Sequence, residues 1–203
     1  MRLLRQIPVP DERAQGRRER RFNRRTFLLG MACLTLAGAW TFAADIGPTV
    51  SEYQVKATFV YNFTKFTDWP SNAFASPDSP IVIGIVGEDP FGKTIDDVVR
   101  GEALRGRPFI VKRLRAGEDL RSCHLLFISR SEKDRLPTVL SQLTGSSVLT
   151  VSEINGFVER GGMVNLTLAN KSVKVEINQA AAEQAGLQIS AKLLKLARLV
   201  RAN

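Results

Sequence analysis

A continuous apolar run, IVIGIV at residues 81–86, constrains the fold of this chain more than any other stretch. A strand with one face in water alternates apolar and polar residues, whereas a strand buried on both faces reads as an unbroken apolar run. Gly87 follows directly and ends the run. The sequence therefore predicts a central strand here, in a sheet that is covered on both faces.

Other segments indicate further strands with helices between them. Three more runs are predicted strands, at 107–114, 123–129 and 147–152, with a short helix before the first and a longer helix before the last. The order strand–helix–strand–strand–helix–strand is typical of sheets with parallel members. Past Gly162, two alternating runs flank a short loop and predict an antiparallel hairpin. We expect an α/β fold: one domain with a layered sheet of mixed, partly parallel strands and flanking helices.

The segment 52–69 has the spacing of a helix that is apolar on two faces. One face, expected to point into the core, carries Val55, Phe59, Phe63 and Phe66. The other face is also apolar and carries Tyr53, Ala57, Val60 and Tyr61. Such a helix is either buried between layers or contacts a partner. We take Tyr53, Val60 and Tyr61 as a candidate partner-binding or dimer surface, and keep burial on both faces as the alternative.

The C-terminal segment SAKLLKLARLV, residues 190–200, is a predicted helix with Ser190 as its N-cap. Its apolar residues are expected to face inward: Leu193, Leu196, Ala197 and Val200. The other side is basic, with Lys192, Lys195 and Arg198. A basic stripe of this kind is most often a solvated face, and contact with an acidic partner or a phospholipid is the alternative.

The first 43 residues have the pattern of an export signal. They contain nine arginines and no lysine, and no charged side chain occurs from Thr26 to Ala44. A basic region, an apolar region and small residues at the end are typical of a secretory signal, here predicted to be cleaved after Ala43. The pair Arg24-Arg25 resembles a twin-arginine signal. An ordinary secretory signal and an uncleaved anchor are the alternatives. We therefore predict a signal at 1–43 and a domain at 44–203.

The net charge of +9 falls once the predicted signal is set aside. Nine of the 29 basic residues and three of the 20 acidic residues lie in 1–43, which leaves 20 and 17, a net of +3. No basic stripe interleaved with aromatic residues remains, so a nucleic-acid partner is not expected.

Residues capable of nucleophilic catalysis are scarce. His124 is the only histidine, and it directly follows Cys123, the only cysteine of the predicted domain. Neighbours along a strand point to opposite faces, so these two side chains are not expected to pair. We expect Cys123 to pack as a small apolar residue, with a reactive thiol as the alternative. No enzyme, cofactor or metal site is predicted.

The carboxyl ends of parallel strands are where ligands usually bind in α/β sheets. Five residues that follow predicted strands are candidate ligand-binding residues: Asp89, Phe91, Arg130, Ser131 and Glu153. Arg130, at the start of a helix, would suit an anionic group. The alternative is that all five are turn and capping residues.

Several stretches taken in order resemble the YfiR-like family of exported bacterial proteins. They are VKATFVYNFTKFTDWP, IVIGIVGEDPFG, CHLLFISRSE, GGMVNL and VEINQAAAEQAGL with LLKLA, and together they run through nearly the whole of 44–203. The resemblance implies a non-enzymatic α/β protein of the Gram-negative periplasm that forms a homodimer. It also implies repression of a membrane-bound diguanylate cyclase, which controls cyclic-di-GMP and biofilm formation.

One feature departs from the namesake of the family, whose extra cysteines form disulfides. The domain here has Cys123 alone, so a disulfide switch within one chain is excluded. A different envelope sensor therefore stays open as the partner. A small-ligand binding or sensing module for another envelope receptor is the alternative function.

Overall fold

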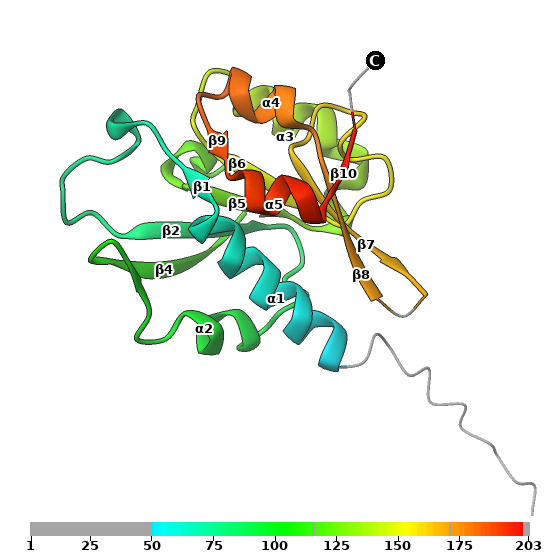
Figure 1. Ribbon diagram of the computed structural model, residues 1–203, viewed down its shortest axis with the longest axis horizontal. Coiled ribbons are helices and arrows are strands. Elements are labelled where there is room, and N and C mark those ends of the chain that lie inside the picture. Colours follow the sequence, from blue (N-terminus) through cyan, green and yellow to red (C-terminus); the bar gives the residue numbers. More distant parts are fainter. Residues whose placement is uncertain (1–49, 116, 171, 201–203) are drawn as a thin grey trace, which may run out of the picture. The chain divides into compact units, whose positions relative to one another are not determined.

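A computed structural model describes residues 50–115, 117–170 and 172–200 (Figure 1). An eight-stranded sheet runs through this part of the chain in the order β10-β8-β7-β6-β5-β2-β4-β3. Its strands are β2 (Ile81–Val86), β3 (Ala103–Leu104), β4 (Arg107–Leu114), β5 (Leu125–Ile128), β6 (Leu149–Ser152), β7 (Val164–Ala169), β8 (Ser172–Ile177) and β10 (Arg198–Leu199). The helices are α1 (Val50–Lys65), α2 (Thr94–Val99), α3 (Leu136–Gln142), α4 (Gln179–Gln184) and α5 (Ala191–Leu196). In the ranges described, no helix has the length and apolar character to cross a bilayer.

The centre of the sheet is parallel, as the apolar runs predict. β2 pairs in parallel with β4 on one side and with β5 on the other, and β6 continues the parallel order. β7 and β8 form the predicted antiparallel hairpin, with Val164 opposite Ile177. All six residues of β2 are buried. The predicted α/β fold with a mixed, partly parallel sheet is confirmed.

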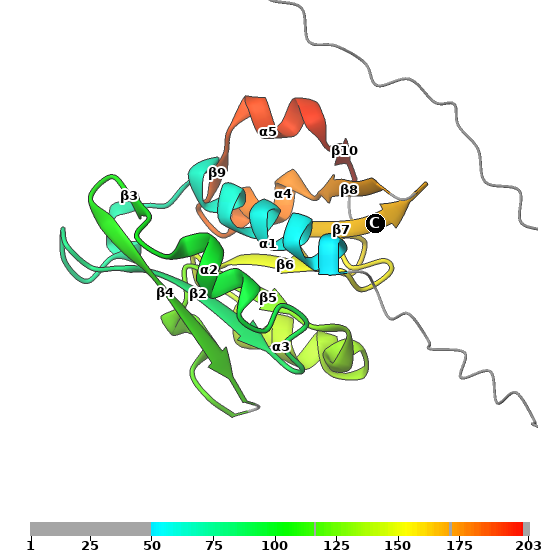
Figure 2. The same ribbon diagram turned by 90° about the horizontal axis from the view of Figure 1, so that it is seen from below.

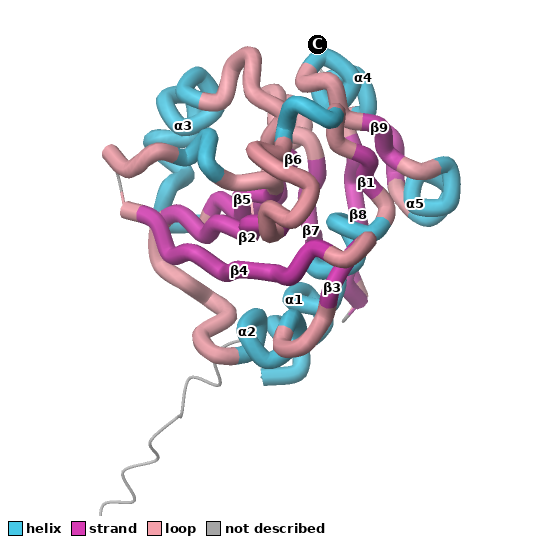
Figure 3. The backbone as a smooth tube through the Cα atoms, turned by 90° about the vertical axis from the view of Figure 1, so that its left-hand side faces the viewer, coloured by secondary structure: helices cyan, strands magenta, loops and turns pink. Residues whose placement is uncertain are grey.

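Helices cover both faces of the sheet and create two apolar cores. Figure 3 shows α3 on one side of β2, β4 and β5, and α1 and α2 on the other. The larger core joins α1, α2, α4 and α5 to the sheet and contains Phe63 and Phe127, among others. The smaller core lies under α3 and contains Leu136 and Phe157. This double cover explains why the central strands have no polar face.

Helix α1 is rotated relative to the prediction. Its fully buried side is the one that carries Val60 and Tyr61, whereas Val55, expected in the core, is exposed. Phe59 is only partly buried, while Phe63 lies in the core as predicted. The prediction of which apolar face points inward was therefore wrong for Val55.

The C-terminal segment is helical over a shorter stretch than predicted. Ser190 caps α5, as expected, by accepting a hydrogen bond of 3.2 Å from the Lys192 N–H. The helix ends at Leu196, and the chain then pairs with β8 as the two-residue strand β10. Leu193 is buried, but Leu196 is 83% exposed, so its predicted inward orientation is wrong.

Two further short strands form a separate sheet. β1 (Thr67–Asp68) follows α1, and β9 (Gln188–Ile189) precedes α5. They pair antiparallel, with Thr67 opposite Ile189. This small second sheet ties the end of α1 to the start of α5. The predicted signal residues Arg24, Arg25 and Ala43 lie outside the described residues.

Candidate functional site

A lysine and a glutamate meet in the interior of the domain where α1 crosses the end of β6. Lys56 is 0% exposed and Glu153, directly after β6, is 3% exposed. The Lys56 ammonium donates to Glu153 Oε2. The same ammonium lies 2.6 Å from Glu52 Oε1, one helical turn earlier. A buried charge is tolerated only when it is paired and hydrogen-bonded, and both conditions are met here.

Two more side chains complete the cluster, which we call the internal charge cluster and define as Glu52, Tyr53, Lys56, Arg130 and Glu153. Arg130 lies at its surface, with 65% of its side chain exposed. The Tyr53 hydroxyl donates to Glu153 Oε1 over 3.2 Å. Arg130 follows the end of β5 by two residues, and its Nε lies 3.4 Å from Glu153 Oε1. The single carboxylate of Glu153 thus joins α1 to the segments that follow both β5 and β6.

The environment of Tyr53 keeps its hydroxyl protonated. Burial, together with the negative charge of Glu153, raises the pKa of Tyr53 to about 12. A protonated hydroxyl is the form that can donate to a carboxylate. The ring of Tyr53 also meets Phe91 edge-on, with centroids 5.9 Å apart, and Phe91 meets Phe127 in the same way at 4.7 Å. The internal charge cluster therefore packs against aromatic side chains of the core.

Of the predicted ligand-binding residues, the structure brings together Arg130 and Glu153, with Phe91 buried nearby beneath Tyr53. Arg130 faces an internal carboxylate in this arrangement. An anionic ligand at Arg130 would therefore compete with Glu153.

Asp89 and Ser131 act in the turn that follows β2. Asp89 accepts hydrogen bonds from the N–H groups of Phe91 and Gly92 at 2.8 and 3.3 Å. Its other oxygen pairs with Arg113 of β4 at 2.9 Å. The Ser131 hydroxyl accepts from the Glu88 N–H at 2.9 Å. These contacts are those of turn and capping residues.

The predicted partner-binding residues do not form an exposed patch. Val60 and Tyr61 are buried, and only Tyr53 is partly exposed. The Tyr61 ring packs edge-on against Phe109 with centroids 5.4 Å apart, and its hydroxyl donates to Glu102. The expectation that this face of α1 is open to a partner is wrong, because the sheet and α2 already occupy it.

Cys123 and His124 are both buried and serve the packing of the sheet. Burial raises the pKa of the Cys123 thiol to about 11, so the thiol is protonated and weakly nucleophilic. His124 Nδ1 accepts a hydrogen bond of 3.1 Å from the Val82 N–H. Its ring stacks on Phe74 with centroids 4.5 Å apart. Neither side chain is placed for catalysis.

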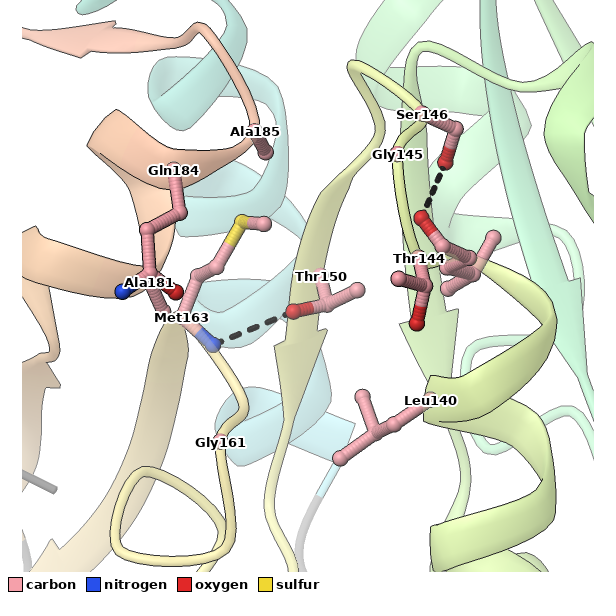
Figure 4. Close-up of a pocket in the computed structure, with 11 residues that line it drawn as sticks. Leu140, Thr144, Gly145, Ser146, Thr150, Gly161, Met163, Ala181, Gln184 and Ala185 are labelled. Carbon is pink, nitrogen blue, oxygen red and sulfur yellow. Dashed lines mark hydrogen bonds between the residues drawn. The ribbon is translucent and has the colours of Figure 1, made fainter. Parts of the chain in front are cut away.

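A separate cavity of about 220 Å³ lies between α3, β6 and α4 (Figure 4). Uncharged residues line it, among them Leu140, Thr150, Met163 and Gln184. Thr150 Oγ1 accepts from the Met163 N–H at 3.1 Å, which fixes the inner wall. The lining includes none of the predicted ligand-binding residues.

Sequence reasoning missed Lys56, which is central to the internal charge cluster. A signal was present, because Lys56 precedes Val60 and Phe63 by four and seven residues and so shares their face of a helix. A lysine on that face of an apolar helix requires a buried acidic partner. In the part of the chain that is described, no group of three or more His, Cys, Asp or Glu side chains is placed to hold a metal ion.

Fold and site together define a small mixed α/β protein with an ion pair buried between α1 and the end of β6. The chain belongs to the YfiR/HmsC-like family, whose model matches residues 53–198. The family is regulatory, non-catalytic and periplasmic, and it acts on diguanylate cyclase systems in general. No curated protein matches the chain significantly.

Proposed function

We propose that the protein is a periplasmic regulator that binds the periplasmic part of a membrane signalling protein and represses a diguanylate cyclase. Repression would lower cyclic-di-GMP in the cell and so limit biofilm formation. The observation that carries this proposal is membership of the YfiR/HmsC-like family over residues 53–198. Residues 1–43 serve as the cleaved export signal, and the domain from residue 44 acts as a homodimer.

The chemistry of the domain is compatible with a binding role. The thiol of Cys123 is buried and protonated, and the imidazole of His124 is held by a backbone N–H and an aromatic stack. A regulator without chemistry of its own can act only by binding two conformations of its target with different affinity. Moving such a target from mostly active to mostly inactive needs a difference of about 5.5 kcal/mol.

Because Val60 and Tyr61 are buried, a partner cannot contact them, and any partner surface on α1 must consist of other residues. Val55 remains available at the surface of α1, on the side of the helix that faces away from the half-buried Tyr53. We therefore propose that a partner contacts α1 through this exposed edge. Val55→Glu is the variant of choice, because the side chain is exposed and its substitution leaves the core intact. Tyr61→Phe, in the core, is a poor probe of any surface.

The test is co-purification from native membranes with the domain from residue 44 as bait. The proposal predicts recovery of a membrane protein that has a cytoplasmic cyclase domain, and weaker recovery with Val55→Glu. Ile110→Glu is the matched control. Ile110 is exposed to the same extent as Val55, but it lies on β4, next to the edge strand β3 of the sheet. Recovery of a different envelope sensor would keep the regulatory role and discard the cyclase.

A further inference from the structure

The surface of α5 and β10 combines exposed leucines with lysines. Leu196 is 83% exposed and Leu199 is 56% exposed, the two most exposed large apolar side chains of the described residues. Lys192 and Lys195 of α5 are exposed as well. We define these four side chains as the C-terminal patch.

The helical geometry of α5 explains why the apolar and basic side chains are neighbours. Leu193 is buried, and Leu194 and Ala197 pack against the same core, which fixes the inward side of this segment. Residues four apart share one face of a helix, so Leu196 stands beside Lys192, and it is exposed whereas Leu193 is buried. In Figure 2, α5 lies at the top, with the other helices on one side of it only.

The charged side chains of the C-terminal segment have a single sign. From Gln184 to the end of the chain the sequence has four basic residues, Lys192, Lys195, Arg198 and Arg201, and no acidic residue. Arg198 is engaged within the domain, because its Nε lies 3.1 Å from Glu176 of β8. Lys192 and Lys195 are therefore the cations that stand beside the exposed leucines.

We propose that the C-terminal patch docks on the surface of an anionic lipid bilayer. Leucines that enter the acyl boundary, between lysines that reach the headgroups, are the composition of segments that lie in a membrane interface. The long lysine stems allow the ammonium groups to stay at the headgroup level while the leucines are buried. Clustered lysines are attracted by anionic headgroups.

Charge argues against a second copy of the chain as the occupant. A two-fold interface brings the same surface of both subunits together. An interface centred on the C-terminal patch would bring Lys192 and Lys195 of one copy near those of the other, and residues 184–203 contain no Asp or Glu side chain to compensate. Burying the leucines in this way would bring like charges into contact.

This inference goes beyond the proposed function and does not depend on the identity of any protein partner. A regulator that rests on the bilayer would meet a membrane-bound target at a raised local concentration. Lipid binding is measured with the domain and vesicles alone. Its failure would leave the proposed regulatory role untouched.

The experiment is vesicle co-sedimentation with the domain from residue 44, which contains all the described elements and both cores. Vesicles of phosphatidylcholine containing phosphatidylglycerol are compared with vesicles of phosphatidylcholine alone. We expect binding to the anionic vesicles, weakened by salt. Leu196→Glu and Lys192→Glu should each lower the partition coefficient about tenfold. Both sites are exposed, so circular dichroism should show an unchanged fold.

Two exposed positions away from the patch provide matched controls. Ile110→Glu on β4 and Lys133→Glu before α3 should leave binding unchanged, since both are exposed but neither lies in the C-terminal patch. Equal binding to neutral vesicles, no binding to anionic vesicles, or full binding by Leu196→Glu would overturn the proposal. So would a change from dimer to monomer by Leu196→Glu in light scattering, which would assign the patch to a second copy.

Discussion

Lys56 and Glu153 form an ion pair in the interior of the domain, between the first helix and the end of the sixth strand. They stand 97 residues apart in the sequence. The pair fixes the position of α1 on the sheet, since an apolar face alone would allow the helix to rotate. Removal of either partner leaves a buried charge with weaker compensation, since only Glu52 would remain beside Lys56 and only Arg130 beside Glu153.

Lys56→Met should strongly destabilise the domain. It leaves the Glu153 carboxylate buried beside Tyr53 with only Arg130 as a neighbouring cation. We expect a loss of about 3–5 kcal/mol in the free energy of unfolding, measured by urea denaturation. The double variant Lys56→Met/Glu153→Leu should recover part of that loss, because neither charge remains.

The control for this prediction is a surface pair. Arg100 and Asp97 on α2 are both exposed, and Arg100→Met should change stability by about 0–1 kcal/mol. A loss of the same size for Arg100→Met and Lys56→Met would contradict the structural role of the internal charge cluster.

His124 should make the domain less stable in mild acid. Burial, with the positive charge of Arg107 as a further cause, holds the pKa of His124 below its usual 6.5. As the pH falls through 6.5, the unfolded chain takes up a proton that the folded domain does not, so stability is lost toward lower pH. His124→Asn keeps an acceptor for the Val82 N–H but cannot titrate. Its unfolding free energy should vary less between about pH 7 and pH 5 than that of the wild type.

An equal pH slope in His124→Asn and the wild type would show that other groups dominate. Since the chain has one histidine, the comparison isolates a single group.

Cys123 should resist thiol reagents until the domain unfolds. The thiol is buried and its pKa is raised to about 11, so little thiolate exists at neutral pH. We expect labelling by a thiol reagent to be at least about 100-fold slower in the native domain than in urea. Ala75→Cys in the Cys123→Ser background offers an exposed thiol as control. Fast labelling of native Cys123 would restore the alternative of a reactive thiol.

Substitution by alanine should destabilise the domain more at Gly87 than at Gly92. Both have positive φ, at 90° and 54°. A Cβ at Gly87 would collide with the Ser131 hydroxyl, whereas a Cβ at Gly92 meets nothing within 4 Å. Gly87→Ala should therefore cost about 1–3 kcal/mol more than Gly92→Ala in thermal or urea unfolding. Equal losses would mean that the turn after β2 can open without cost.

The central strands and the hairpin could be predicted from the sequence because their burial leaves a local pattern. Residues 81–86 are apolar without interruption, and β2 is buried throughout. The two-residue strands β1, β9 and β10 carry no such pattern. Their pairing depends on residues more than 20 positions away, such as Thr67 with Ile189.

The candidate site was harder to predict because its contacts depend on register. Asp89 faces Arg113 since β2 and β4 pair Ile85 with Arg113, which sets that arginine beside the end of β2. No pattern within either segment specifies this alignment. The rotation of α1 is hard to predict for a related reason: Lys56 can lie on the buried face only because of its partner Glu153, which lies in a distant segment.

The most direct test of the central claim is the cyclic-di-GMP content of the native cell with and without this protein. Repression by this protein predicts a higher content after deletion of the gene, and a return to the original content when the full chain is restored. A chain without residues 1–43 should not restore it, since it would not be exported. Unchanged cyclic-di-GMP after deletion, or full restoration by the chain that lacks residues 1–43, would contradict the proposed periplasmic repression.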